Sequence, residues 1–87
     1  MLSDFLLNAI RGNLEFVKSY SSLDERDEFG NSALLLISIL CKSKMDEYFK
    51  YDTIASYRSI IEYLAGIPRL MDLPNNFGLT ARNVIQR

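Results

Sequence analysis

The pattern of hydrophobic and polar positions predicts five helical segments separated by polar turns. Within each segment, apolar residues recur every three or four positions or line the whole helix, as in helices that pack on a core. A Ser, Asn or Thr begins or precedes four of them and can cap the first turn, while glycine ends two of them. The segments are 3–11, 14–20, 33–41, 57–65 and 81–87.

Two stretches leave alternatives open. Segment 33–41 is a short apolar run, so a buried strand competes with a helix, although its leucine-rich composition and the preceding Ser32 favour the helix. Residues 42–56 are charged, rich in aromatic residues and free of Gly and Pro. An added helical turn and an ordered loop both fit this second stretch.

One phrase of the sequence occurs twice. Residues 27–34 and 75–82 share an acid or amide, then Phe, Gly, a small hydroxyl residue and Ala, at positions 48 residues apart. Gly30 and Gly78 can each supply a turn that other residues resist. A recurring unit of this kind indicates stacked modules, which present a binding surface rather than a reaction centre.

These phrases resemble ankyrin repeats. Residues 9–18 are similar to the phrase between the two helices of that family's unit, residues 27–34 and 75–81 to its turn, and residues 60–64 to its second helix. The resemblance implies an all-α fold, an ankyrin-type stack of antiparallel helix pairs joined by β-turn or hairpin loops. An unrelated small helical domain with two similar turns is the alternative.

The resemblance also implies how the chain is divided. One domain covers residues 1–87, with a first repeat at about 3–26, a second at about 27–74 and a partial third at about 75–87. The two glycines lie about 15 residues further apart than the family's period of about 33. That excess falls in an insertion at 42–56, inside the second repeat.

Composition and charge indicate the size of the protein and the compartment in which we expect it. The 87 residues make one small domain with a net charge of −1, unevenly spread: residues 1–41 carry −3 and residues 58–87 carry +2. The lone Cys41 lies in an apolar run and fits a buried, inert thiol in a reducing compartment. We expect no signal peptide, because the first four residues carry no basic group, and the longest apolar stretch is too short to span a bilayer. We expect an intracellular protein, cytoplasmic or nuclear, with no membrane partner.

The residue inventory argues against catalysis. The chain contains no His and one Cys, so Ser–His and Cys–His pairs cannot form, and no phosphate-binding glycine loop is present. The paired acids at 24–25, 27–28 and 46–47 lie in charged loops and fit a solvated surface. We expect no enzyme activity, no metal, no cofactor and no small-molecule substrate.

The resemblance implies that a protein partner binds the turn tips and the concave helix face. Each Phe of the two turns either anchors that partner or packs against the neighbouring turn. The corresponding candidate residues are Glu28, Phe29, Asn31, Asn76, Phe77 and Leu79.

The insertion supplies a second candidate surface. Tyr48, Phe49 and Tyr51, with Tyr57 close by, either fold back on the core or meet a partner.

Two hypotheses about function follow. The first is a small ankyrin-type adaptor or inhibitor, a non-catalytic protein–protein interaction module. The second is a structural or regulatory subunit of a large assembly, such as the ribosome or another ribonucleoprotein, held through residues 42–56 and the basic C-terminal part. Phe5, Leu6 and Leu7 at one end, and an unpaired last helix at the other, predict self-association or attachment to a larger assembly.

Overall fold

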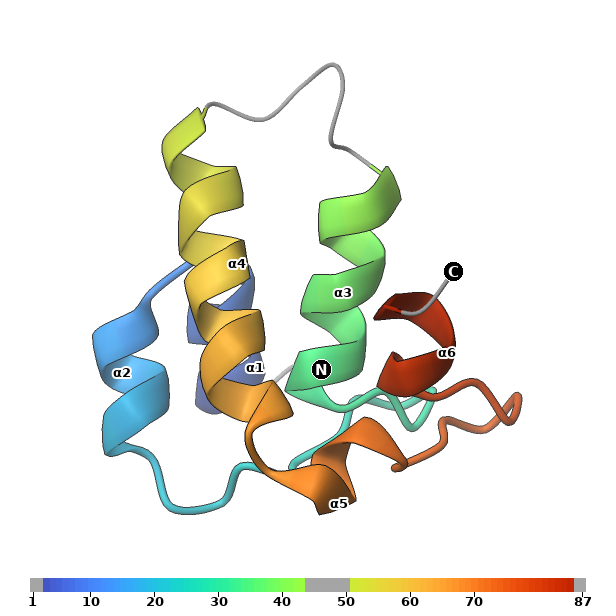
Figure 1. The fold of residues 1–87 in the computed structure, drawn as a ribbon. Coiled ribbons are helices and arrows are strands. Elements are labelled where there is room, and N and C mark those ends of the chain that lie inside the picture. Colours follow the sequence, from blue (N-terminus) through green and yellow to red (C-terminus); the bar gives the residue numbers. More distant parts are fainter. Residues whose placement is uncertain (1–2, 44–50, 86–87) are drawn as a thin grey trace.

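A computed structural model describes residues 3–43 and 51–85, apart from the side chains of Ser43 and residues 51–54. Within these ranges the chain is helical and has no strand, and its β structure is limited to an isolated bridge between Arg26 and Ser32. The all-α fold class is therefore confirmed (Figure 1). The helices are α1 (Asp4–Ile10), α2 (Leu14–Ser19), α3 (Ala33–Ser43), α4 (Tyr51–Ala65), α5 (Pro68–Met71) and α6 (Ala81–Ile85).

Helices α1, α3 and α6 begin in the same way. Each is preceded by a hydroxyl residue whose side-chain oxygen accepts a hydrogen bond from the backbone N–H three positions later. This bond satisfies one of the N–H groups that a helix start leaves unpaired. The predicted caps are confirmed, with distances of 3.3 Å for Ser3 and Leu6, 3.2 Å for Ser32 and Leu35, and 3.2 Å for Thr80 and Asn83.

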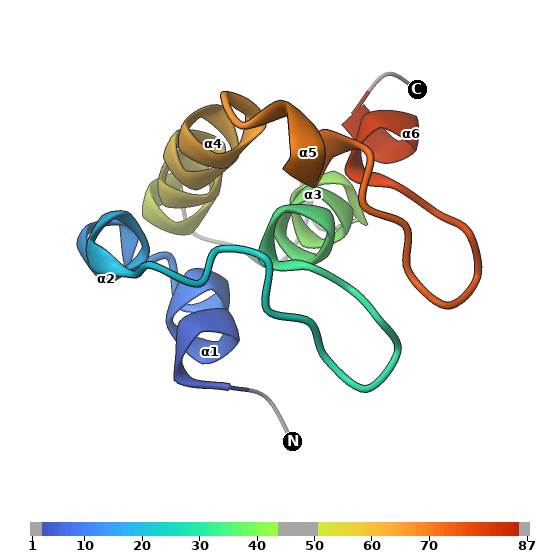
Figure 2. The ribbon, with the colours of Figure 1, turned by 90° about the horizontal axis from the view of Figure 1, so that it is seen from below.

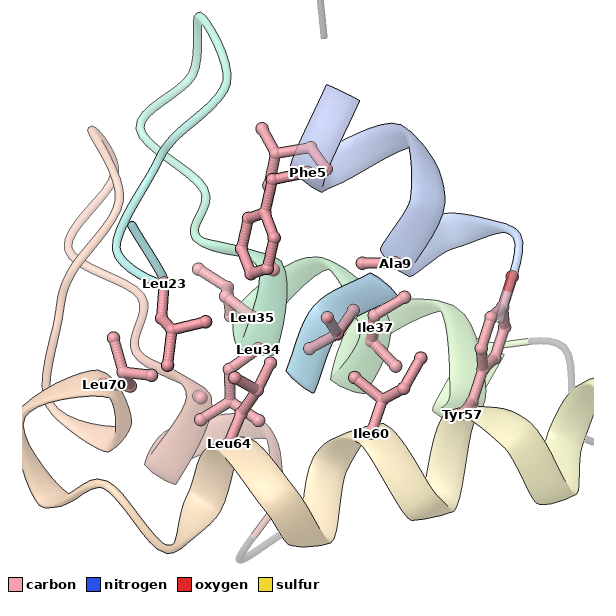
Figure 3. Close-up of a cluster of buried hydrophobic side chains, with 14 of the residues drawn as sticks. Phe5, Ala9, Leu23, Leu34, Leu35, Ile37, Tyr57, Ile60, Leu64 and Leu70 are labelled. Atoms are coloured by element: carbon pink, nitrogen blue, oxygen red, sulfur yellow. The ribbon is translucent and has the colours of Figure 1, made fainter. Parts of the chain in front are cut away.

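Helix α3 is the centre of the molecule. It packs against α1, α4, α5 and α6, and in the end-on view it lies between them (Figure 2). Leu34, Leu35 and Ile37 are buried in the core (Figure 3). The buried hydroxyl of Ser38 donates to the carbonyl oxygen of Leu34 at 2.7 Å, so it costs little to bury. The helix interpretation of this segment is confirmed, but the helix is not buried on every side, since Leu36, Ile39 and Leu40 are only half-buried.

Helix α4 runs antiparallel to α3 along most of its length (Figure 1). It begins at Tyr51, earlier than the predicted start at Tyr57, so the helical alternative holds for residues 51–56. Tyr57 does not face a partner: it is buried, and its hydroxyl donates to the carbonyl oxygen of Ile10 at 2.6 Å. This hydrogen bond ties α4 to the end of α1.

The short helix α5 was not predicted. It begins at Pro68, which suits a first helical position because the N–H that proline lacks has no partner there. Leu70 of this turn is fully buried, so packing explains a helix too short to be visible in the sequence pattern. Beyond it, Arg82 of α6 pairs with Asp72, Nε to Oδ1 at 2.7 Å and Nη2 to Oδ2 at 3.2 Å.

Of the three apolar residues that begin α1, two are buried and Leu7 is half-buried. Phe5 and Leu6 are fully buried, and the ring of Tyr20 stacks on that of Phe5 with centroids 4.9 Å apart. The short hairpin of α1 and α2 brings this ring over the end of the core. In the part of the chain that the structure describes, no helix combines the length and apolar character needed to cross a membrane.

Candidate functional site

Loop 27–31 is built around the side chain of Asp27. Its Oδ1 accepts hydrogen bonds from the backbone N–H groups of Phe29 and Asn31, both at 2.9 Å. The carbonyl oxygen of Asp27 accepts from Gly30 at 3.0 Å, and Gly30 has a φ of 81°. A residue with a Cβ resists that backbone conformation, which explains the glycine.

Loop 75–79 repeats this geometry. Oδ1 of Asn75 accepts from the N–H groups of Phe77 and Leu79 at 2.9 and 3.0 Å. Its carbonyl oxygen accepts from Gly78 at 3.0 Å, and Gly78 also has a φ of 81°. The two loops, 48 residues apart in sequence, therefore have the same local hydrogen-bond pattern.

The two loops lie against each other and project to the same side of the molecule (Figure 2). The backbone N–H of Asn76 donates to the carbonyl oxygen of Phe29 at 2.9 Å, and its Nδ2 donates to that of Glu28 at 3.3 Å. A Cβ built on Gly30 would lie 2.9 Å from the backbone nitrogen of Asn76, so glycine also allows this close approach.

A chain of side-chain hydrogen bonds joins the bases of the loops. Oδ2 of Asp27 accepts from Nδ2 of Asn31 at 3.1 Å, and Oδ1 of Asn31 accepts from Nδ2 of Asn75 at 2.8 Å. Oδ1 of Asn75 then accepts the two backbone N–H groups of its own loop. We call Asp27, Asn31 and Asn75 the side-chain ladder. Asp27 and Asn75 were not among the predicted site residues, although both stand two positions before a Phe in the repeated phrase.

The phenylalanines stand at the exposed tips of these loops. The side chain of Phe29 is 52% exposed and that of Phe77 is 80% exposed. Phe77 therefore makes little contact with a neighbouring turn, whereas about half of the surface of Phe29 is covered. Glu28 and Asn76 are exposed beside them, while Asn31 and Leu79 are half-buried at the loop bases. The structure brings these six predicted residues onto one surface, which we call the paired tips.

The predicted residues of the insertion cannot be placed on this surface. Tyr48 and Phe49 lie outside the described residues, and Tyr51 begins α4 without a described side chain.

Cys41 differs from its prediction, since it is half-buried rather than buried. The thiol lines a small hollow near α6.

The groups with shifted pKa values lie away from the tips. The hydrogen bond from Arg82 lowers the pKa of Asp72, and the hydrogen bond between Tyr20 and Glu25 raises the pKa of Tyr20. Burial raises the pKa of Tyr57, with a smaller contribution from the charge of Cys41. None of these shifts creates an acid–base pair beside the phenylalanines.

The described residues contain no group of three or more side chains that could hold a metal ion. The polar groups at the bases of the paired loops mostly bond to each other, while the tips expose two aromatic rings together with Glu28 and Asn76. Comparisons of the chain with models of protein families, with curated proteins and with solved structures found no match.

Proposed function

We propose that the chain is a non-catalytic protein–protein interaction module that binds a protein partner through the paired tips. The observation that carries this proposal is the presence of Phe29 and Phe77 at the same position of two hydrogen-bonded loops of equal geometry. Large exposed apolar side chains are expensive to leave in water, and aromatic residues dominate binding hot spots. Because the loops are already held together, little conformational entropy is lost in ordering them when a partner binds.

The proposed architecture is an ankyrin-type stack with units at about 3–26, 27–74 and 75–87. Three features support it. Helices α1, α3 and α6 have the same kind of hydroxyl cap, the loops before α3 and α6 have the same hydrogen-bond pattern, and α3 lies between α1 and α6. In such a stack the first helices would line a concave face next to the tips. The partner would then contact both, inside the cell and in a reducing compartment that suits a lone cysteine.

Affinity capture tests the proposal. Tagged wild-type chain is compared with the double variant Phe29→Ala/Phe77→Ala in extract of the cells that make it, with mass spectrometry of the bound proteins. The control is Glu15→Ala, which removes an exposed side chain from α2, a helix that contributes no residue to the paired tips. We expect a partner that the wild type and the control retain. The double variant should bind it at least about 30-fold more weakly, since a hot-spot residue contributes about 2 kcal/mol or more.

All three proteins must melt at similar temperatures for this comparison to be valid, and the exposure of both rings makes that the expected result. A partner that the double variant captures as well as the wild type does would contradict the proposal.

Salt dependence separates this proposal from attachment to a ribonucleoprotein. Contacts with phosphate weaken steeply as salt rises, whereas contacts of aromatic rings do not. The charge of Arg82 is already paired with Asp72, which removes one cation from the basic C-terminal part, while Arg58 and Arg69 are exposed. We expect the partner to be captured equally well at 50 and 500 mM salt. Over this range, a site with several phosphate contacts would lose about a thousandfold or more in affinity.

A further inference from the structure

An apolar hollow of about 160 Å³ lies between α3, α4 and α6. Its wall is almost entirely nonpolar, and the hydroxyl of Ser38 is already bonded within α3. Ile85 stands at its edge and, with Phe29 and Phe77, is one of the large apolar side chains that are exposed among the described residues. The lining residues are Ser38, Cys41, Lys42, Ile61, Val84 and Ile85.

The register of the helix caps shows which place in the fold this hollow occupies. Ser38 and Cys41 stand six and nine positions after the cap Ser32, as Ala9 and Gly12 stand after the cap Ser3. The hollow beside α3 therefore corresponds to the surface of α1 and the adjoining turn around Ala9 and Gly12.

In the earlier unit, helix α4 covers that surface. A Cβ built on Gly12 would meet the Cβ of Ser56 at 3.0 Å, which shows how closely α4 approaches. Tyr57 donates to the carbonyl oxygen of Ile10, and Ile60 is fully buried with Ala9 (Figure 3). Side chains of an antiparallel helix thus fill the equivalent of the hollow.

We propose that the hollow beside α6 receives a helix of a partner protein, in the position relative to α3 and α6 that α4 takes relative to α1 and α3. The fitting occupant is an amphipathic helix with large apolar residues spaced as Tyr57, Ile60 and Leu64, one of which enters the hollow. A volume of this size holds one large side chain, so the site anchors one face of a helix and does not hold a small-molecule ligand. This site is separate from the paired tips and does not depend on the function proposed for them.

The chain itself contains the probe for this site. A synthetic peptide of residues 51–66 reproduces the helix that fills the equivalent surface, and Cys41, the lone cysteine, lines the hollow. The rate at which a small thiol reagent labels Cys41 is measured with and without the peptide. We expect about threefold slower labelling at 1 mM peptide, because a short isolated helix is only partly formed and binds weakly.

Two controls make the result specific. A peptide carrying Ile60→Asp should give no protection, and the chain variant Ile85→Glu, or the milder Ile85→Gln, should no longer be protected by the normal peptide. The variant Phe29→Ala/Phe77→Ala should be protected as the wild type is, which distinguishes this site from the paired tips.

Three results would overturn the proposal. The first is no protection by the normal peptide, and the second is protection that persists with the Ile60→Asp peptide or in the Ile85 variants. The third is a chain that forms dimers at tens of micromolar and loses them on Ile85→Glu, because it would assign the hollow to a second copy of this chain.

Discussion

Asparagine and aspartate are not interchangeable in the side-chain ladder. Asp27 stands at one end as an acceptor only, whereas Asn75 stands at the other end, where it must donate to Asn31 through Nδ2 and accept the N–H groups of its own loop through Oδ1. A carboxylate has no proton to donate at neutral pH. The acid in one copy of the repeated phrase and the amide in the other therefore have different roles.

The variant Asn75→Asp tests the ladder. The new carboxylate keeps the bonds to the N–H groups of its loop but faces Oδ1 of Asn31 with no donor between them. We expect the free energy of unfolding to fall by about 1–3 kcal/mol, measured by urea denaturation. Ser21→Asp adds the same charge at an exposed position and should change stability little. Equal effects of the two variants would mean that the ladder contributes nothing.

The two loop glycines offer a second comparison at the residue scale. Both have a positive φ, but a Cβ on Gly30 would meet Asn76, while one on Gly78 would meet no atom within 4 Å. Gly78→Ala should cost only the backbone strain, about 1–2 kcal/mol. Gly30→Ala should cost about 1–3 kcal/mol more, because it forces the loops apart. Urea denaturation of both variants measures the difference, and equal costs would show that the loops are not in this contact.

At the scale of elements, a capping side chain marks the start of α1, α3 and α6, and a glycine turn precedes α3 and α6; these local signals are readable in sequence. The position of α4 depends instead on contacts between helices. Tyr57 illustrates this, because its hydroxyl reaches across to the carbonyl oxygen of Ile10 at the end of α1. Nothing in the sequence around Tyr57 indicates that partner, which lies 47 residues away.

The variant Tyr57→Phe tests this link between α4 and α1. It keeps the buried ring but removes the donor, so we expect thermal or urea unfolding to show a loss of about 1–3 kcal/mol. Tyr63→Phe is the matched control on the same helix, since Tyr63 is only half-buried and its ring interacts with Lys18 rather than through a buried hydroxyl. A loss that is no larger than that of the control would contradict the role of the hydrogen bond.

The variant Tyr57→Phe should also change how the stability of the fold depends on pH. Burial raises the pKa of Tyr57 above 10.0, so the unfolded chain releases this proton first as the pH rises. The stabilisation by the neutral phenol is full below about pH 10 and is lost as the pH rises through the folded pKa. Tyr57→Phe should therefore lose less stability than the wild type between pH 9 and 11, an interval chosen to bracket the ordinary pKa of tyrosine. The variant should still lose some stability at alkaline pH, because the pKa of Tyr20 is also raised.

At the scale of the molecule, the exposed apolar side chains of the described chain are concentrated in two places. The paired tips hold Phe29 and Phe77, and the hollow beside α6 holds Ile85. Exposed large apolar residues that form part of a shaped surface indicate interaction sites. Because the two places are built by different elements, one binding event need not exclude the other, and the proposed experiments separate them.

The sequence by itself determined the local features of this protein. Helical periodicity, the caps at Ser3, Ser32 and Thr80, and the glycine of each repeated phrase act over a few residues, so they can be read without knowledge of the fold. The duplicated phrase also indicated which loop residues belong together, and the structure places those residues side by side.

Only the tertiary structure decided the rest, because the deciding interactions join residues that are far apart in the chain. In the structure, α4 starts at Tyr51 and the burial of Leu70 accompanies the extra helix α5. The ring of Tyr20 stacks on Phe5, and Cys41 is half-buried. The tertiary structure also decided that the phenylalanines are exposed, since whether a ring packs on a neighbouring turn depends on where that turn lies. Periodicity and composition contain no information about such distances, which packing of the whole chain sets.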